Sequence, residues 1–65
     1  MNPKFSDVTV KLVGEDGNAF SIMSRVRTAL IESGYSDHVD EYLEQAKSGD
    51  YDNLLRVTMA TVNCE

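Results

Sequence analysis

The fold is decided by the stretch Asp7-Val8-Thr9-Val10-Lys11-Leu12-Val13-Gly14-Glu15-Asp16-Gly17-Asn18. Its first half alternates between apolar and mostly polar residues, which is typical of a half-buried strand over 7–13. The side chains expected on the buried face of that strand are Val8, Val10 and Leu12. The turn-forming residues that follow end the strand, and Asn18 is placed to cap a helix that begins after it.

Helical periodicity follows immediately. From Ala19 to about Ser33, apolar residues recur every three or four positions, and Gly34 stands where a glycine commonly ends a helix. The residues that predict the buried stripe of this first helix are Phe20, Met23, Val26 and Leu30.

Two further helices are predicted. The second begins at a cap formed by Ser36 or Asp37 and ends at Gly49, and its inward side chains are Val39, Tyr42, Leu43 and Ala46. The third is capped by Asp50, and its inward side chains are Tyr51, Leu54, Leu55 and either Thr58 or Met59.

The last residues, 61–65, alternate again and predict a short strand with Val62 and Cys64 on one face; the alternative is a continuation of the third helix. The whole chain, 1–65, is therefore expected to form one small α+β domain of order β-α-α-α-β. If successive helices are antiparallel, the two strands point the same way and can pair in parallel, packed on the helices. A two-stranded sheet leaves edges that helices or a second copy of the chain must cover.

Composition narrows the classes of function. The chain has 65 residues and a net charge of −5, with one cysteine and one histidine. These counts exclude an internal disulfide and an ordinary zinc site, so we expect no bound metal and stability from packing or self-association. No apolar run approaches the ~20 residues that cross a bilayer, and no apolar leader is present, so a cytoplasmic protein without membrane contact is expected.

Two blocks carry a resemblance to known proteins. Leu12-Val13-Gly14-Glu15-Asp16-Gly17-Asn18-Ala19-Phe20 and Ser48-Gly49-Asp50-Tyr51-Asp52-Asn53-Leu54-Leu55 resemble a group of small uncharacterised bacterial and phage-borne proteins. The resemblance implies a compact α+β domain and an origin in a mobile element. It brings no catalytic residues with it.

An anion or nucleotide site is one hypothesis for the Gly14–Asn18 loop. Free amides at a helix start can hold an anion, and the residues that would do so here are Gly17, Asn18, Arg25 and Arg27. The spacing matches neither common nucleotide-binding motif, and Glu15 and Asp16 would repel a phosphate. A plain strand-to-helix turn is therefore the favoured interpretation.

The catalytic candidates are weak. Ser36, Asp37 and His38 are neighbours in sequence and cannot converge on a substrate, so His38 is expected to be a solvated helix residue. Cys64 has no base near it in sequence that would activate a thiol. We therefore expect no catalytic residue, no cofactor and no enzymatic activity.

The negative charge is local. Residues 32–52 carry seven acidic residues against a single base, Lys47, whereas residues 1–31 carry more bases than acids. One interpretation is a solvated face that keeps a small domain soluble; the other is a docking surface for a partner protein with a basic surface. The candidate partner-binding residues are Asp37, Asp40, Glu41, Glu44, Asp50 and Asp52. We also expect a homo-oligomer, and the scattered basic residues disfavour direct binding of nucleic acid.

Overall fold

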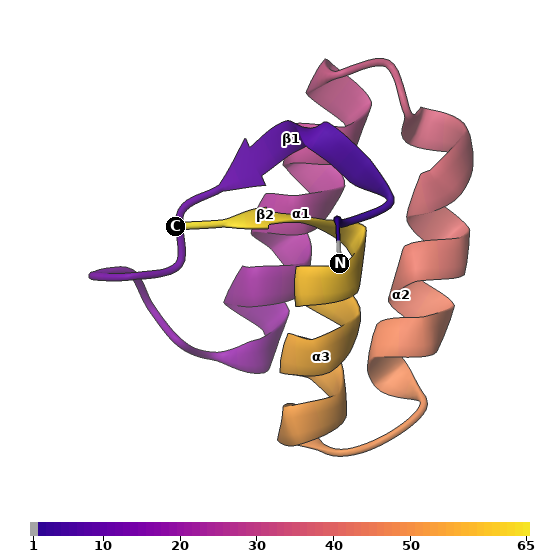
Figure 1. Ribbon diagram of the computed structural model, residues 1–65. Coiled ribbons are helices and arrows are strands. Elements are labelled where there is room, and N and C mark those ends of the chain that lie inside the picture. The colour runs from indigo at the N-terminus through magenta and orange to yellow at the C-terminus, as the bar shows by residue number, and fades with distance from the viewer. Residues whose placement is uncertain (1) are drawn as a thin grey trace.

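The computed structural model describes residues 2–65 (Figure 1). The elements follow the predicted β-α-α-α-β order, with one added turn of 3₁₀ helix. They are β1 (Phe5–Val10), α1 (Ala19–Glu32), η1 (Ser36–His38), α2 (Val39–Lys47), α3 (Tyr51–Thr61) and β2 (Val62–Cys64). The strands pair in parallel, as predicted, and the three helices run up, down and up behind them (Figure 1).

Strand β1 begins and ends earlier than the predicted 7–13. Val8 and Val10 face the core as expected, but Phe5 joins them, and Leu12 lies beyond the strand and is only half-buried. The pairing with β2 is irregular between Phe5 and Thr9, where the Asn63 side-chain amide donates to the Ser6 carbonyl. Strand β2 has only three residues, but backbone pairing continues past it: the Glu65 amide donates to the Val10 carbonyl at 2.9 Å, and the Leu12 amide donates to the Glu65 carbonyl at 2.6 Å.

Helix α1 confirms the predicted start and stop signals. The Asn18 Oδ1 accepts a hydrogen bond from the Phe20 amide at 2.8 Å, and Gly34 takes a positive φ of 87° just after the helix. The buried stripe is Ile22, Met23, Val26 and Leu30. Phe20, predicted to lie in that stripe, is 75% exposed, because it is rotated by roughly 100° from the line through Met23, Val26 and Leu30.

The second helix differs from the prediction at both ends. Neither Ser36 nor Asp37 caps an α-helix; they form η1, and α2 starts at Val39 without a side-chain cap. Helix α2 ends at Lys47, before Gly49. Gly49 instead packs closely against α3, since a Cβ at this position would lie 2.9 Å from the Asn53 Cβ. Glycine is therefore required at 49 by packing and not by a positive φ.

Helix α3 resolves two open alternatives. The Asp50 carboxylate accepts a hydrogen bond from the Asn53 amide at 2.9 Å, which confirms the cap. Thr58 is the inward residue, whereas Met59 is 58% exposed. The helix stops at Thr61, and residues 62–64 form the terminal strand.

The core lies between the sheet and the helices. Val26 and Leu30 of α1 are fully buried, and Val62 brings β2 into the same cluster. One buried polar contact crosses this core: the hydroxyls of Tyr42 and Thr58 share a hydrogen bond of 2.8 Å between α2 and α3. That bond satisfies two hydroxyls which would otherwise be buried without a partner.

Candidate functional site

The acidic residues of the middle of the chain fall into two groups. Asp37 of η1 and Asp40, Glu41 and Glu44 of α2 are exposed. On a helix that advances roughly 100° per residue, the three acids of α2 lie opposite its buried side chains Val39, Tyr42 and Ala46. We call Asp37, Asp40, Glu41 and Glu44 the acidic face.

The remaining two acids, Asp50 and Asp52, stand at the start of α3 and are not part of that face. The Asp50 carboxylate is committed to capping α3. Asp52 lies in the first turn of the helix, where a negative charge is favoured by the helix dipole.

One acid of the acidic face has a partner within the chain. Lys4 Nζ lies 3.2 Å from Glu41 Oε1, and about half of each side chain remains exposed, so the pair is worth little to stability. Within residues 2–65, no hydrogen bond or ion pair holds the carboxylates of Asp37, Asp40 or Glu44. Like charges at helical spacings of three and four weaken a helix by a few tenths of a kcal/mol per pair, so the acidic face carries a small cost in stability.

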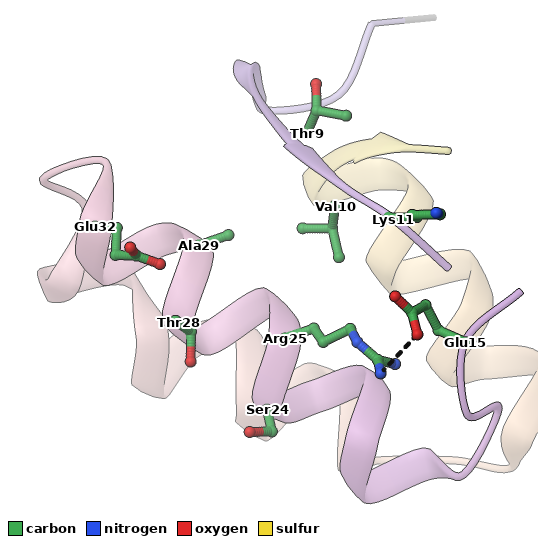
Figure 2. Close-up of a pocket in the computed structure, with 9 residues that line it drawn as sticks. All are labelled: Thr9, Val10, Lys11, Glu15, Ser24, Arg25, Thr28, Ala29 and Glu32. Carbon is green, nitrogen blue, oxygen red and sulfur yellow. Dashed lines mark ion pairs between the residues drawn. The ribbon is translucent and has the colours of Figure 1, made fainter. Parts of the chain in front are cut away.

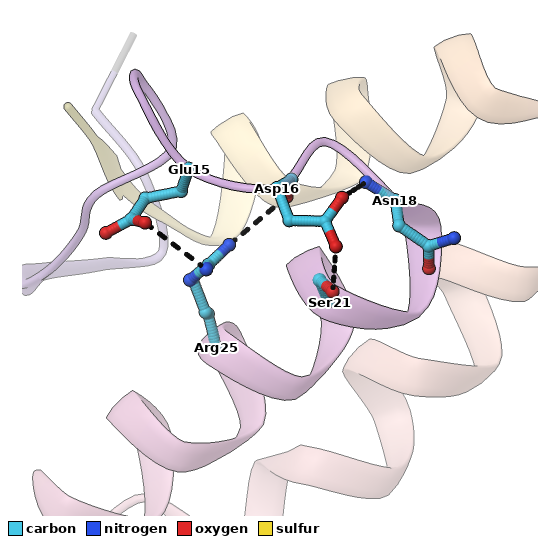
Figure 3. Close-up of polar contacts among 5 residues, drawn as sticks. All are labelled: Glu15, Asp16, Asn18, Ser21 and Arg25. Carbon is cyan, nitrogen blue, oxygen red and sulfur yellow. Dashed lines mark hydrogen bonds and ion pairs between the residues drawn. The ribbon is translucent and has the colours of Figure 1, made fainter.

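The loop proposed for an anion is occupied by the chain's own groups (Figure 3). The Asp16 carboxylate accepts hydrogen bonds from the Asn18 amide at 3.0 Å and from the Ser21 hydroxyl at 3.3 Å. The Tyr51 hydroxyl donates to the Gly17 carbonyl at 2.6 Å. A carboxylate of the protein therefore stands at the start of α1, where an external anion would have to bind.

The two arginines of that hypothesis are separated. Arg25 donates to the Asp16 carbonyl at 3.2 Å and lies 3.6 Å from the Glu15 carboxylate, so its charge is paired within the loop (Figure 3). Arg27 is two residues further along α1, which turns it by roughly 200° away from Arg25. The structure thus brings Gly17, Asn18 and Arg25 to one loop and leaves Arg27 outside it.

A shallow groove of about 340 Å³ lies between β1 and α1 (Figure 2). Its charged lining is balanced, because it contains two bases, Lys11 and Arg25, and two acids, Glu15 and Glu32. The ion pair between Arg25 and Glu15 closes one side of it. This balance gives the groove no preference for an anionic ligand.

The side chains considered for catalysis are engaged in packing. His38 is not the solvated residue predicted: it is half-buried, and its ring centroid lies 4.9 Å from that of Phe5. Burial raises the pKa of the Cys64 thiol, which keeps it in the protonated and less nucleophilic form at neutral pH. Asp37 and Ser36 are exposed on η1, beside His38 in sequence.

Phe20 exposes a surface that the sequence pattern assigned to the core. It borders a groove of about 490 Å³, where α1 begins, α2 ends and α3 begins. The signal available in the sequence was the offset of Phe20 from the line of Met23, Val26 and Leu30. The offset did not decide the matter, because an apolar residue beside a helical stripe can either widen the buried stripe or lie exposed next to it.

Residues 2–65 contain no group of three or more histidine, cysteine or acidic side chains arranged to hold a metal ion. None of the helices described for this chain has both the length and the apolar content needed to span a bilayer. No protein-family model, curated protein or solved structure matches the chain.

Proposed function

We propose that the protein acts by binding a second protein that carries a basic surface, and that the acidic face is where this partner docks. The observation that carries the proposal is the exposure, without partners inside residues 2–65, of Asp37 on η1 and of Asp40 and Glu44 on the solvent side of α2. Clustered charges of one sign steer an oppositely charged protein and speed its association.

On this proposal the chain is a non-enzymatic accessory or regulatory protein. The engagement of His38 with Phe5 and the protonated state of Cys64 support that choice over a catalytic one. We also propose a cytoplasmic location, where a lone thiol such as that of Cys64 stays reduced.

Charge reversal tests the acidic face. The variant Asp40→Lys/Glu44→Lys changes two exposed acids that have no partner among residues 2–65. The control variant Glu32→Lys/Glu65→Lys changes the net charge by the same amount at two exposed acids outside the acidic face. Each variant and the parent protein would be used as bait in lysate of the native host, and the captured proteins would be quantified by mass spectrometry.

We expect recovery of the partner to fall by at least about tenfold with Asp40→Lys/Glu44→Lys, which corresponds to about 1.4 kcal/mol of binding free energy. The control should retain it, and added salt should weaken capture by the parent protein because exposed charges are screened. Equal recovery by both variants would mean that the acidic face only keeps the protein soluble.

A further inference from the structure

Strand β1 has an open edge. It pairs with β2 on one side, and no other strand of the described chain lies beside it (Figure 1). The Val10 carbonyl accepts a hydrogen bond from the Glu65 amide, and the Leu12 amide donates to the Glu65 carbonyl, so both residues turn these groups toward β2 and the end of the chain. Successive residues of a strand turn their backbone groups to opposite sides, so Thr9 and Lys11 turn theirs to the open edge.

The outward backbone groups lack partners. Asp7 shares the orientation of Thr9, because the Ser6 carbonyl before it is held on the β2 side by the Asn63 side chain. The rest of the described chain forms no hydrogen bond to the outward groups of Asp7, Thr9 and Lys11. A row of unpaired amides and carbonyls is matched by another strand, which bonds to all of them at once. The structure therefore specifies the conformation of what binds at this edge, an extended strand.

There is room for such a strand beside β1. The groove of about 340 Å³ is lined by Thr9 and Lys11 from the exposed face of β1 and by Val10 from its core face, so it follows the edge itself (Figure 2). The small side chains that line it from α1 are Ser24, Thr28 and Ala29. An added strand can therefore lie next to β1 with one of its faces over α1.

The charges on β1 identify the strand that fits. The exposed side chains that alternate with Val8 and Val10 are Asp7, Thr9 and Lys11, so an acid and a base stand two positions to either side of Thr9. We infer that β1 pairs antiparallel with β1 of a second copy of the chain, around a two-fold axis between the two Thr9 residues. Each Asp7 then lies directly opposite Lys11 of the other copy, which makes two opposite-charge pairs across the interface.

Both charges are available for these pairs. The Tyr35 hydroxyl donates to the Asp7 carboxylate at 2.7 Å, and this neutral donor orients the carboxylate without cancelling its charge. Lys11 is exposed, and no ion pair holds it within residues 2–65. The two groups are therefore free to meet those of a second copy.

The same register satisfies the backbone. Because Thr9 turns both its amide and its carbonyl outward, the two Thr9 residues exchange two hydrogen bonds, and Asp7 exchanges two with Lys11 of the other copy. On the core side, Val8 lies opposite Val10 of the other copy, so the apolar face continues across the interface. The two sheets become one of four strands, ordered β2-β1-β1-β2, which exceeds the roughly three strands that a stable sheet requires.

Other occupants fit this edge less well. Parallel pairing of two copies in register would place Asp7 beside Asp7 and Lys11 beside Lys11, and like charges directly opposite one another are destabilising. A strongly basic or strongly acidic strand would gain nothing from a groove whose lining holds two bases and two acids. A second copy carries the alternation that matches β1.

The inference is independent of the proposed function. The acidic face lies on η1 and α2, and none of its residues belongs to β1 or lines the groove. Pairing along β1 does not use those carboxylates. Failure of one idea therefore leaves the other standing.

Sedimentation equilibrium from about 10 μM to about 1 mM tests the dimer directly. The parent protein would be measured beside Lys11→Glu, Asp7→Lys and the exchange variant Asp7→Lys/Lys11→Glu. The matched control, Arg27→Glu, makes the same change of charge as Lys11→Glu at an exposed residue of α1 that does not line the groove. Urea unfolding of each variant at low concentration establishes that it folds.

We expect the dissociation constant to rise at least about tenfold with each single variant, to stay within about threefold for the exchange variant, and to change less than about twofold with Arg27→Glu. An equimolar mixture of Lys11→Glu and Asp7→Lys should dimerise about as tightly as the parent protein, because each chain then provides the charge that the other lacks. A parent protein that stays monomeric across the range overturns the inference. So does a dimer that Lys11→Glu leaves unchanged, or an exchange variant no tighter than the weaker single variant.

The backbone of Thr9 provides a second test. Thr9→Pro removes an amide hydrogen that only the dimer uses, and proline is tolerated in a strand whose amide faces outward. We expect this variant to stay monomeric at about 1 mM, whereas Thr9→Val, which keeps the amide, should dimerise within about threefold of the parent protein. A folded Thr9→Pro variant that dimerises like the parent overturns the backbone pairing.

Hydrogen exchange examines the same amide without a substitution. In the parent protein, exchange of the Thr9 amide with solvent should slow at least about threefold between about 10 μM and about 1 mM, because the amide becomes bonded in the dimer. A Thr9 exchange rate that does not depend on protein concentration overturns the inference.

Discussion

Phe5 on β1 and Phe20 on α1 are both large apolar residues, but they differ in what covers them. Phe5 is 8% exposed and Phe20 is 75% exposed. The ring of Phe5 is covered by Tyr35, with ring centroids 4.5 Å apart, and by His38. Phe20 stands at the other end of α1, where no later part of the chain returns to cover it. Burial of an aromatic residue in this small domain is therefore decided by the loop that crosses it and not by its own strand or helix.

The largest expected effect comes from truncating these two rings. Phe5→Ala should destabilise the protein by about 3–5 kcal/mol, because it removes a buried ring and leaves a cavity. A domain of this length has a free energy of unfolding of roughly 3–10 kcal/mol, so much of the protein should unfold. Phe20→Ala should change the stability of the dilute monomer by less than about 0.5 kcal/mol. Urea denaturation followed by circular dichroism measures both, and equal losses would contradict the difference in burial.

A smaller effect separates two tyrosine hydroxyls. Tyr42→Phe removes the partner of the buried Thr58 hydroxyl and should cost about 1–3 kcal/mol. Tyr51→Phe removes an exposed hydrogen bond to the Gly17 carbonyl and should cost about 1 kcal/mol or less.

The double variant Tyr42→Phe/Thr58→Val provides the control for the buried pair. It should lose less than the sum of Tyr42→Phe and Thr58→Val, because no hydroxyl is then left buried without a partner. Additive losses would show that the two hydroxyls do not interact in solution.

Local signals in the sequence predicted most of the fold. The caps at Asn18 and Asp50 are confirmed because a cap depends only on a side chain and the amides two or three residues after it. The parallel pairing of the strands is confirmed because short loops oblige successive helices to reverse.

What could not be predicted depends on contacts between distant segments. The register of β1 is set by β2, more than fifty residues later, and by the side-chain bond from Asn63 to the Ser6 carbonyl. The half-burial of His38 requires Phe5, which lay outside the predicted strand. Gly49 was explained by helix termination, whereas it is required by its distance from Asn53 on the next helix.

The candidate sites also divide into features that local sequence predicts and features that depend on contacts formed only in the folded chain. Asp40, Glu41 and Glu44 could be placed on the solvent side of a helix from their spacing alone, and the structure arranges them so on α2. The pairing of Arg25 with Glu15, and the bonds that Asp16 makes at the start of α1, depend on how the loop folds back. Only the assembled structure shows that this loop is occupied.

The smallest expected effect is a fall in stability at alkaline pH, and it comes from side chains that other parts of the chain cover or bind. Burial raises the pKa of Tyr42 above its ordinary 10.0 and that of Cys64 above 9.0, while a hydrogen bond to the Asp7 carboxylate raises the pKa of Tyr35 above 10.0. A raised pKa in the folded state means that stabilisation is complete below the unfolded-state pKa and is lost as the pH rises through the folded-state value.

The free energy of unfolding should therefore fall as the pH rises above about 9, and more steeply above about 10. Tyr42→Phe should make the fall above pH 10 shallower, because one of the phenols whose pKa is raised by folding is then missing. Phe20→Ala changes no titratable group. Its effect on the free energy of unfolding should therefore be the same at every pH. Urea titrations at a series of pH values give these slopes. If Tyr42→Phe kept the slope of the parent protein, the phenol would be ionising as readily in the folded protein as in the unfolded chain, which contradicts its enclosure between α2 and α3.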